Sequence, residues 1–225
     1  MSFASKTREV RLKEHTLETE ILSDRAYNGL MSGLVVYGIL VAYLMSKYLY
    51  IDVSINLWLF FLGFFGISFG GVILTNRAES FALRFVGYNM VVLSFGFSVS
   101  ATVQAYGGVY AKPIVEAFGY TLIICVAMCA ISVIFPDFFV GMGRVLFINL
   151  IVLLVMLLIR LVFPTQLWFV SYLGAALFSF YIAHDFARSQ MFSKTANHAI
   201  ACALDIYMDL INLFLYLVEI FGRRN

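Results

Sequence analysis

Long, uninterrupted apolar runs constrain the fold of this chain more than any other feature of its sequence. Several runs reach the roughly 20 residues that a helix needs to cross a bilayer core about 30 Å thick, and few carry an interior charge. Hydrophobic residues make up 62% of the 225 residues and charged residues 12%, whereas soluble domains are about 45–50% apolar and about 25% charged. The runs are continuous rather than alternating, which favours helices over a transmembrane barrel. The sequence therefore predicts an all-α, polytopic membrane protein.

Hydropathy and turn residues predict a bundle of seven transmembrane helices. They span residues 27–50, 56–75, 81–105, 114–135, 139–163, 166–187 and 198–221. Pro136 and Pro164 end the fourth and fifth helices, since proline cannot continue a helix. Residues 1–26 are expected to form a polar cytoplasmic N-terminal segment, and residues 27–225 the transmembrane domain.

The distribution of basic residues predicts the orientation. With seven spans, ten of the 15 Lys and Arg residues fall on the side that holds the N-terminus. Cytoplasmic loops carry an excess of Lys and Arg, so we expect the N-terminus in the cytoplasm. A net charge of +2 with charges at helix ends gives no reason to expect a nucleic-acid partner, and the expected surroundings are the lipid bilayer.

The last predicted helix carries its polar residues at spacings of three and four, which place them on one face. Counting from His198, these steps reach Asp205, Asp209, Asn212 and Glu219, with apolar residues between them. An ionisable side chain at membrane depth costs roughly 2.5–3.5 kcal/mol on insertion scales. We therefore expect this polar stripe to face protein or water rather than lipid.

A partner for the stripe stands at the end of the sixth predicted helix, where His184 and Asp185 follow an apolar run. A short loop joins the sixth and seventh helices, so Asp185 could approach Asp209 or Asp205. Two carboxylates in a dry site tend to share one proton. Raising the pH would remove that proton and push the helices apart or recruit a cation. This pattern is typical of a pH-sensitive latch on a cation path, but the same carboxylates could simply hydrogen-bond the bundle together.

Other ionisable residues give weaker signals. Glu116 opens the fourth predicted helix, where an acidic side chain suits the N-terminus. Arg77 lies near a cytoplasmic helix end and could either snorkel or pair with Asp185. No histidine cluster suggests a metal site, and no nucleophile–base spacing suggests catalysis. We therefore expect neither a metal centre, nor another cofactor, nor an enzyme.

Three segments together resemble the Bax inhibitor-1 family, the transmembrane Bax-inhibitor-motif proteins, in a bacterial version. They are EAFGYT (116–121), FSFYIAHDF (178–186) and LDIYMDLINLFLYLVEIFG (204–222). The resemblance implies a seven-helix fold with the last helix central, in a bacterial inner membrane. It also implies a pH-sensitive Ca²⁺ leak governed by paired aspartates, which fall on Asp185 and Asp209, and a gating arginine best matched by Arg77.

The chain departs from the family pattern at several positions. His184 stands where the family commonly has tyrosine, Asp205 adds a carboxylate one turn before Asp209, and VSATVQAY (99–106) lacks the usual proline. An alternative function is that of an interaction protein restraining a membrane protease, as some bacterial relatives are thought to do. That alternative predicts that the charged tail Ser5–Asp24 matters more than the buried carboxylates.

Overall fold

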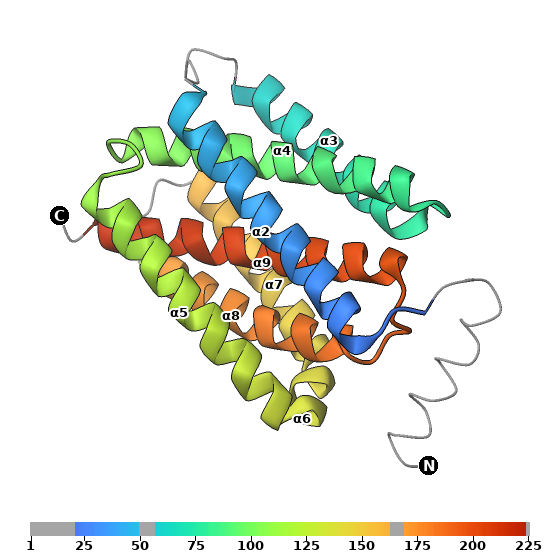
Figure 1. The fold of residues 1–225 in the computed structure, drawn as a ribbon. Helices are drawn as coiled ribbons and strands as arrows, with labels where there is room; N and C mark the ends of the chain where they lie inside the picture. The colour runs from blue at the N-terminus through green and yellow to red at the C-terminus, as the bar shows by residue number, and fades with distance from the viewer. Residues whose placement is uncertain (1–20, 50–56, 163–168, 224–225) are drawn as a thin grey trace. The chain divides into compact units, whose positions relative to one another are not determined.

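The computed structural model describes residues 21–49, 57–162 and 169–223, and within these ranges every regular element is a helix. In chain order the helices are α2 (Asp24–Tyr48), α3 (Leu57–Arg77), α4 (Phe81–Ala105), α5 (Lys112–Ile134), α6 (Pro136–Gly141), α7 (Gly143–Val162), α8 (Phe169–Ser189) and α9 (Ala196–Gly222) (Figure 1). The predicted all-α class is confirmed for the described residues. Each of the seven predicted helices has a counterpart of 20 residues or more.

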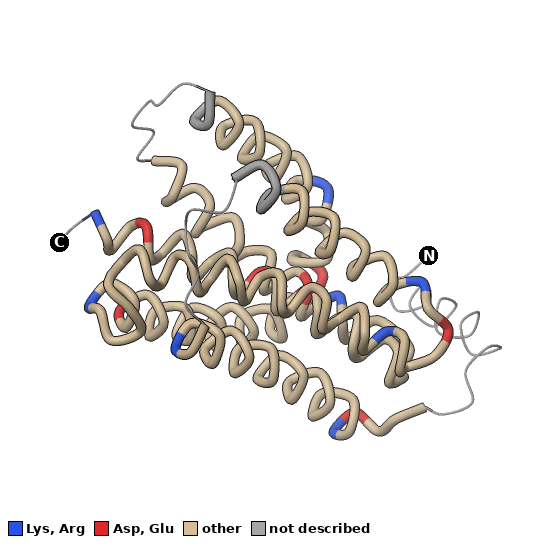
Figure 2. Tube along the Cα trace, turned by 90° about the horizontal axis from the view of Figure 1, so that it is seen from above, with Lys and Arg blue, Asp and Glu red and all other residues tan. Residues whose placement is uncertain are grey.

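Five of these helices are long and apolar enough to cross a membrane, namely α2, α4, α5, α8 and α9. Helix α7 contributes a shorter apolar stretch, Gly143–Ile159, and α3 is not among the five. The chain is thus a multi-pass membrane protein, while the count of seven spans stays a prediction. Many charged residues lie near helix ends (Figure 2), as with Asp24 at the start of α2 and Arg77 at the end of α3, while some acidic residues lie within a helix, as in α9.

The region after α5 corrects one predicted boundary. A single helix over 139–163 is wrong at its start, because the short α6 begins at Pro136 and α7 begins only at Gly143. Gly141 and Gly143 flank the break, and glycine is a poor helix former. Residues 1–20 of the polar N-terminal segment, residues 50–56 around the predicted connection of the first two helices, and Pro164 lie outside the described residues.

The chain divides into two compact units, and α9 contributes to both. The first unit comprises Met1–Ala101 with Arg188–Tyr207, and the second comprises Thr102–Ala187 with Met208–Asn225. Of the five candidate spans α9 is the most buried, with 67% of its most apolar stretch inside the protein against 17% for α5. The central position expected of the last helix stays a prediction, and this burial supports it.

In the first unit, buried tyrosines join helices by donating to backbone carbonyls. The Tyr88 hydroxyl donates to the Leu34 carbonyl oxygen at 2.6 Å, and the Tyr207 hydroxyl donates to the Val92 oxygen at 3.3 Å. The Tyr207 ring lies against Gly38, where an added Cβ would stand only 2.7 Å from the ring. A residue without a side chain is therefore needed for α2 and α9 to pack this closely.

In the second unit, small residues of α8 receive aromatic side chains from its neighbours. Phe139 of α6 packs with Ala183 and Ala187 of α8 in one buried cluster. Nearer the start of α8, Gly174 lies under the ring of Tyr216 from α9, where an added Cβ would meet ring atoms at 2.6 Å. These contacts fix α8 between α6 and the second half of α9, and thereby position the polar residues described next.

Candidate functional site

Asp209 stands midway along α9, equally far from Ala196 and Gly222. At a rise of 1.5 Å per residue, about 20 Å of helix separates it from either end. Its side chain is buried, with only 6% of the residue exposed. A carboxylate at this depth costs several kcal/mol unless neighbouring groups or a proton compensate its charge.

Helices α8 and α9 run antiparallel where they pack in the second unit. Gly174 and Phe178 of α8 both contact Tyr216, and the Phe178 and Tyr216 rings stack with centroids 5.8 Å apart. Farther along α8, Tyr181 interacts electrostatically with Asp209, which precedes Tyr216 on α9. As the residue number increases along α8, the number of the residue that it contacts on α9 decreases. This is the antiparallel arrangement that the short connection between the two helices predicts.

Tyr181 interacts with both predicted sensor residues. It interacts electrostatically with Asp209 from α9 and with Asp185 from its own helix. Asp185 follows Tyr181 by one helical turn, so the two side chains share a face of α8. Tyr181 is thus a group that both acids influence, and it joins the site as a residue that the sequence analysis missed.

His184 holds a defined orientation beside Asp185. Its Nδ1 lies 2.7 Å from the Phe139 carbonyl oxygen, which can only accept, so Nδ1 carries a proton and donates. The other ring nitrogen, Nε2, lies 3.8 Å from Asp185 Oδ1. On its far side the ring meets Gly143, where an added Cβ would stand 3.0 Å from Cε1. The Phe139 carbonyl thus holds the His184 ring while its Nε2 lies on the side of the Asp185 carboxylate.

Two other residues of the predicted stripe have polar partners close to them in the sequence. The Asn212 amide donates back to the Met208 carbonyl of its own helix at 2.8 Å. Glu219 pairs with Arg223, four residues later and near the end of α9. Asp205 is half-buried and belongs to the first unit. Spacing placed these residues on one face, and Asp209 is the buried acid among them and interacts with Tyr181 of α8.

The other predicted residues lie apart from this site. Glu116 pairs with Lys112 at 3.9 Å, and it lies in the second turn of α5 because that helix begins at Lys112. Glu116 at the helix N-terminus is therefore a wrong prediction. Arg77 is exposed at the end of α3 in the first unit, and its pairing with Asp185 stays a prediction.

The chemistry available at this site is proton exchange between weak acids and a base. It contains two carboxylic acids, a phenol and an imidazole, from Asp185, Asp209, Tyr181 and His184. Among residues 21–49, 57–162 and 169–223, no group of three or more His, Cys, Asp or Glu side chains could hold a metal ion. An arrangement of this kind changes its charge with pH, and the buried position of Asp209 makes that charge costly.

Residues 20–225 match the family described as "Inhibitor of apoptosis-promoting Bax1". The chain belongs to this family. Similar proteins include uncharacterized proteins from two strains of Helicobacter pylori, each 30% identical over 177 residues that cover 73% of this chain and 71% of the relative. An uncharacterized Campylobacter jejuni protein is 27% identical over 189 residues, which cover 78% of this chain and 76% of the relative. The family resemblance seen in the three sequence segments is confirmed.

Proposed function

We propose that this member of the Bax1 inhibitor family is a pH-sensitive leak for cations, with Ca²⁺ as the transported ion. Asp185 and Asp209 act as its proton sensor, and the protein lies in a bacterial inner membrane with its N-terminus in the cytoplasm. The observation that carries the proposal is that Tyr181 interacts electrostatically with both acids, one of which, Asp209, is deeply buried. The proposal includes neither a resident metal nor an enzymatic step.

The proposed mechanism depends on the number of protons that the acid pair holds. When the two carboxyl groups share one proton, their single negative charge is compensated locally and α8 stays packed against α9. When the pH rises, the shared proton leaves and two like charges face each other. Two such charges 4 Å apart repel by about 4 kcal/mol at an effective dielectric constant of about 20. That repulsion is large enough to favour a state in which α8 and α9 move apart and cations pass.

The Tyr181 and His184 side chains have supporting roles in this proposal. The tyrosine hydroxyl can donate a hydrogen bond to either carboxylate and so stabilise the singly protonated pair. The imidazole of His184 can offer a second place for the proton next to Asp185. Neither residue replaces the acids, because only the carboxyl groups create the like-charge repulsion that separates the helices.

The test is ion flux from purified protein in Ca²⁺-loaded vesicles, measured with an external dye from pH 6 to pH 8. Flux through the wild-type protein is expected to rise with pH, whereas Asp209→Asn and Asp185→Asn should each give flux that no longer depends on pH. Asp137→Asn is the matched control, since Asp137 is an exposed carboxylate of α6 in the same unit. Unchanged flux and pH dependence in both site variants would contradict the proposal.

The alternative is restraint of a membrane protease through the N-terminal tail Ser5–Asp24, most of which lies outside the described residues, and it stays a prediction. Deleting residues 2–20 distinguishes the two functions. A leak gated by the acid pair should keep its pH dependence after this deletion. An interaction protein should instead lose its partner in a pull-down while the Asp209→Asn variant keeps it.

A further inference from the structure

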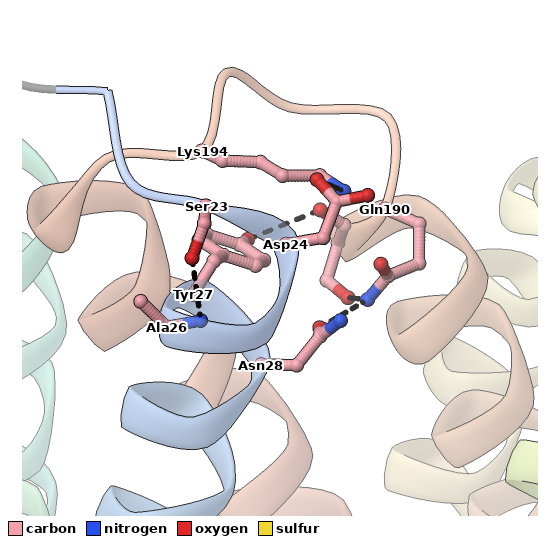
Figure 3. A network of polar contacts seen from close by, with 8 residues as sticks. Ser23, Asp24, Ala26, Tyr27, Asn28, Gln190 and Lys194 are labelled. Atoms are coloured by element: carbon pink, nitrogen blue, oxygen red, sulfur yellow. Dashed lines mark hydrogen bonds and ion pairs between the residues drawn. The ribbon is translucent and has the colours of Figure 1, made fainter.

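The connection between α8 and α9 is held against the start of α2 by a cluster of polar contacts (Figure 3). Lys194 Nζ lies 2.6 Å from Asp24 Oδ1, and the Lys194 carbonyl accepts a hydrogen bond from the Leu22 amide at 2.7 Å. The Gln190 amide donates to Asn28 Oδ1 at 2.9 Å. All of these residues belong to the first unit, and together they tie two segments that are far apart in the sequence.

A buried tyrosine extends this anchorage to the last residue of α8. Tyr27, with 0% of its surface exposed, donates its hydroxyl to the Ser189 carbonyl oxygen at 3.0 Å. That carbonyl belongs to the last turn of α8, where helix carbonyls lack partners within the helix. Asp185 lies one turn before Ser189 on the same helix, so the anchored end of α8 also carries the acid that the proposed sensor uses.

The connection itself is compact rather than loose. The Met191 amide donates to the Arg188 carbonyl at 3.0 Å, and Thr195 caps α9 by accepting from the His198 amide at 3.2 Å. Phe192 stacks on the His198 ring with centroids 5.4 Å apart. A connection tied this closely to both helix ends transmits a displacement instead of absorbing it, so holding residues 190–195 also restrains the ends of α8 and α9.

We propose that the Asp24–Lys194 ion pair is a clasp that positions the end of α8 and keeps the proposed leak closed at acidic pH. This inference rests on the proposed function and adds a positioning element outside the acid pair. For α8 to move away from α9, its end and the connection must shift, and the clasp opposes that shift. Asp24 and Lys194 are thus positioning residues that act on the sensor through the α8 backbone.

The two partners of the clasp are buried to different extents, which gives the proposal a directional test. The Lys194 side chain is only 15% exposed, whereas that of Asp24 is 82% exposed. Removing the carboxylate leaves a poorly hydrated ammonium group, which is costly. Removing the ammonium leaves a carboxylate that water can solvate, and a methionine at 194 still packs as the lysine stem does. Asp24→Asn should therefore loosen the connection more than Lys194→Met.

Hydrogen exchange of the full-length protein in vesicles measures the clasp without reference to ion flux. The Leu22 amide bonds across the clasp, so peptides that contain residue 22 or residues 190–195 report on it. We expect exchange to accelerate about two- to fivefold in the single variants, more in Asp24→Asn, and to slow again in the charge-swapped Asp24→Lys/Lys194→Glu protein. Lys112→Met is the matched control, because Lys112 forms its ion pair within one helix.

Calcium flux at pH 6 supplies the second measurement. The single variants should leak about two- to fivefold faster than wild type, and the swapped protein should return towards wild type. Unchanged exchange, a swap without rescue, or faster exchange with unaltered flux would each overturn the inference. If the wild-type protein conducts no ion at any pH, the proposed function is wrong, and the exchange data alone then decide whether the ion pair restrains the connection.

Discussion

The α8–α9 hairpin carries two charge pairs of opposite kinds. At its connection, Asp24 and Lys194 attract each other, and their contact needs no added proton near neutral pH. Along its length, Asp185 and Asp209 are two acids that both interact electrostatically with Tyr181. Opposite charges stabilise the first pair, whereas the second, in the mechanism proposed above, is compatible with close packing only when the two acids hold a proton.

The difference suggests that two parts of the hairpin have two separate roles, one in holding the helices and one in responding to pH. Neutral and oppositely charged groups hold the connection, as the Tyr27 hydroxyl and the clasp show. In the proposed mechanism, the two acids supply the response to pH. If this division is correct, variants at the acid pair should change how flux depends on pH, and variants at the connection should change only how much flux there is.

The largest expected effect is that of the two acid substitutions, alone or combined. Asp185→Asn and Asp209→Asn should each abolish the pH response, and the double variant should differ little from either single one, because the two residues share one proton. A one-proton gate changes its population by up to about tenfold per pH unit, so vesicle flux at pH 6 and pH 8 resolves the loss. A double variant that regains pH dependence would contradict the assignment of the pH response to the acid pair.

A steric substitution should separate the acids without changing any charge. In Gly174→Ala the new Cβ would meet the Tyr216 ring at 2.6 Å, and that ring is held by its stacking on Phe178. We expect a loss of about 1–3 kcal/mol in stability, measured by thermal unfolding in detergent, together with higher flux at pH 6. Gly119→Ala is the control, because nothing lies within 4 Å of a Cβ there. Equal melting temperatures for the two variants would contradict the packing described for α8 and α9.

At the connection between α8 and α9, Tyr27→Phe removes the hydroxyl that donates to the Ser189 carbonyl. The Ser189 carbonyl then loses a buried donor, at a cost of about 1 kcal/mol. Thermal unfolding should show that loss, and flux should rise at every pH with the same pH midpoint. Tyr110→Phe is the control, since Tyr110 is 80% exposed. A shifted midpoint in Tyr27→Phe would show that the two regions do not act separately.

The smallest expected effect is that of salt. Raising the salt concentration from 0.1 M to 0.5 M shortens the screening length from about 10 Å to about half that value. Because Asp24 is largely exposed, its attraction to Lys194 should weaken, and wild-type flux at pH 6 should rise less than about twofold. The Lys194→Met variant lacks the pair and should not respond. An equal salt effect in both proteins would assign it to the membrane rather than to the clasp.

The sequence was sufficient to predict most of the helices and the acids of the site. Apolar runs bounded by prolines located the seven long helices, and spacings of three and four placed Asp209 on a polar face. The helix break at Met142 was missed because hydropathy continues across it, although Gly141 and Gly143 flank the position. Tyr181 could have been found, since it precedes Asp185 by one helical turn on the same face.

Contacts between distant segments could not be predicted in this way. Asp24 and Lys194 are separated by 170 positions in the sequence, and the sequence around either residue does not predict a contact with the other. The same applies to Gly174 under Tyr216 and to the His184 bond to Phe139. Spacing determines which face of a helix a residue occupies, but the packing of whole helices determines what that face meets.

One feature of the architecture bears on how the protein is made. Each of the two compact units combines an earlier part of the chain with a part of α9, the last helix to be synthesised. Neither unit can therefore be completed while the ribosome is still translating the preceding helices. A chain that stops short of residue 196 would leave both units unfinished, so a premature stop late in the gene should be as damaging as one near its beginning.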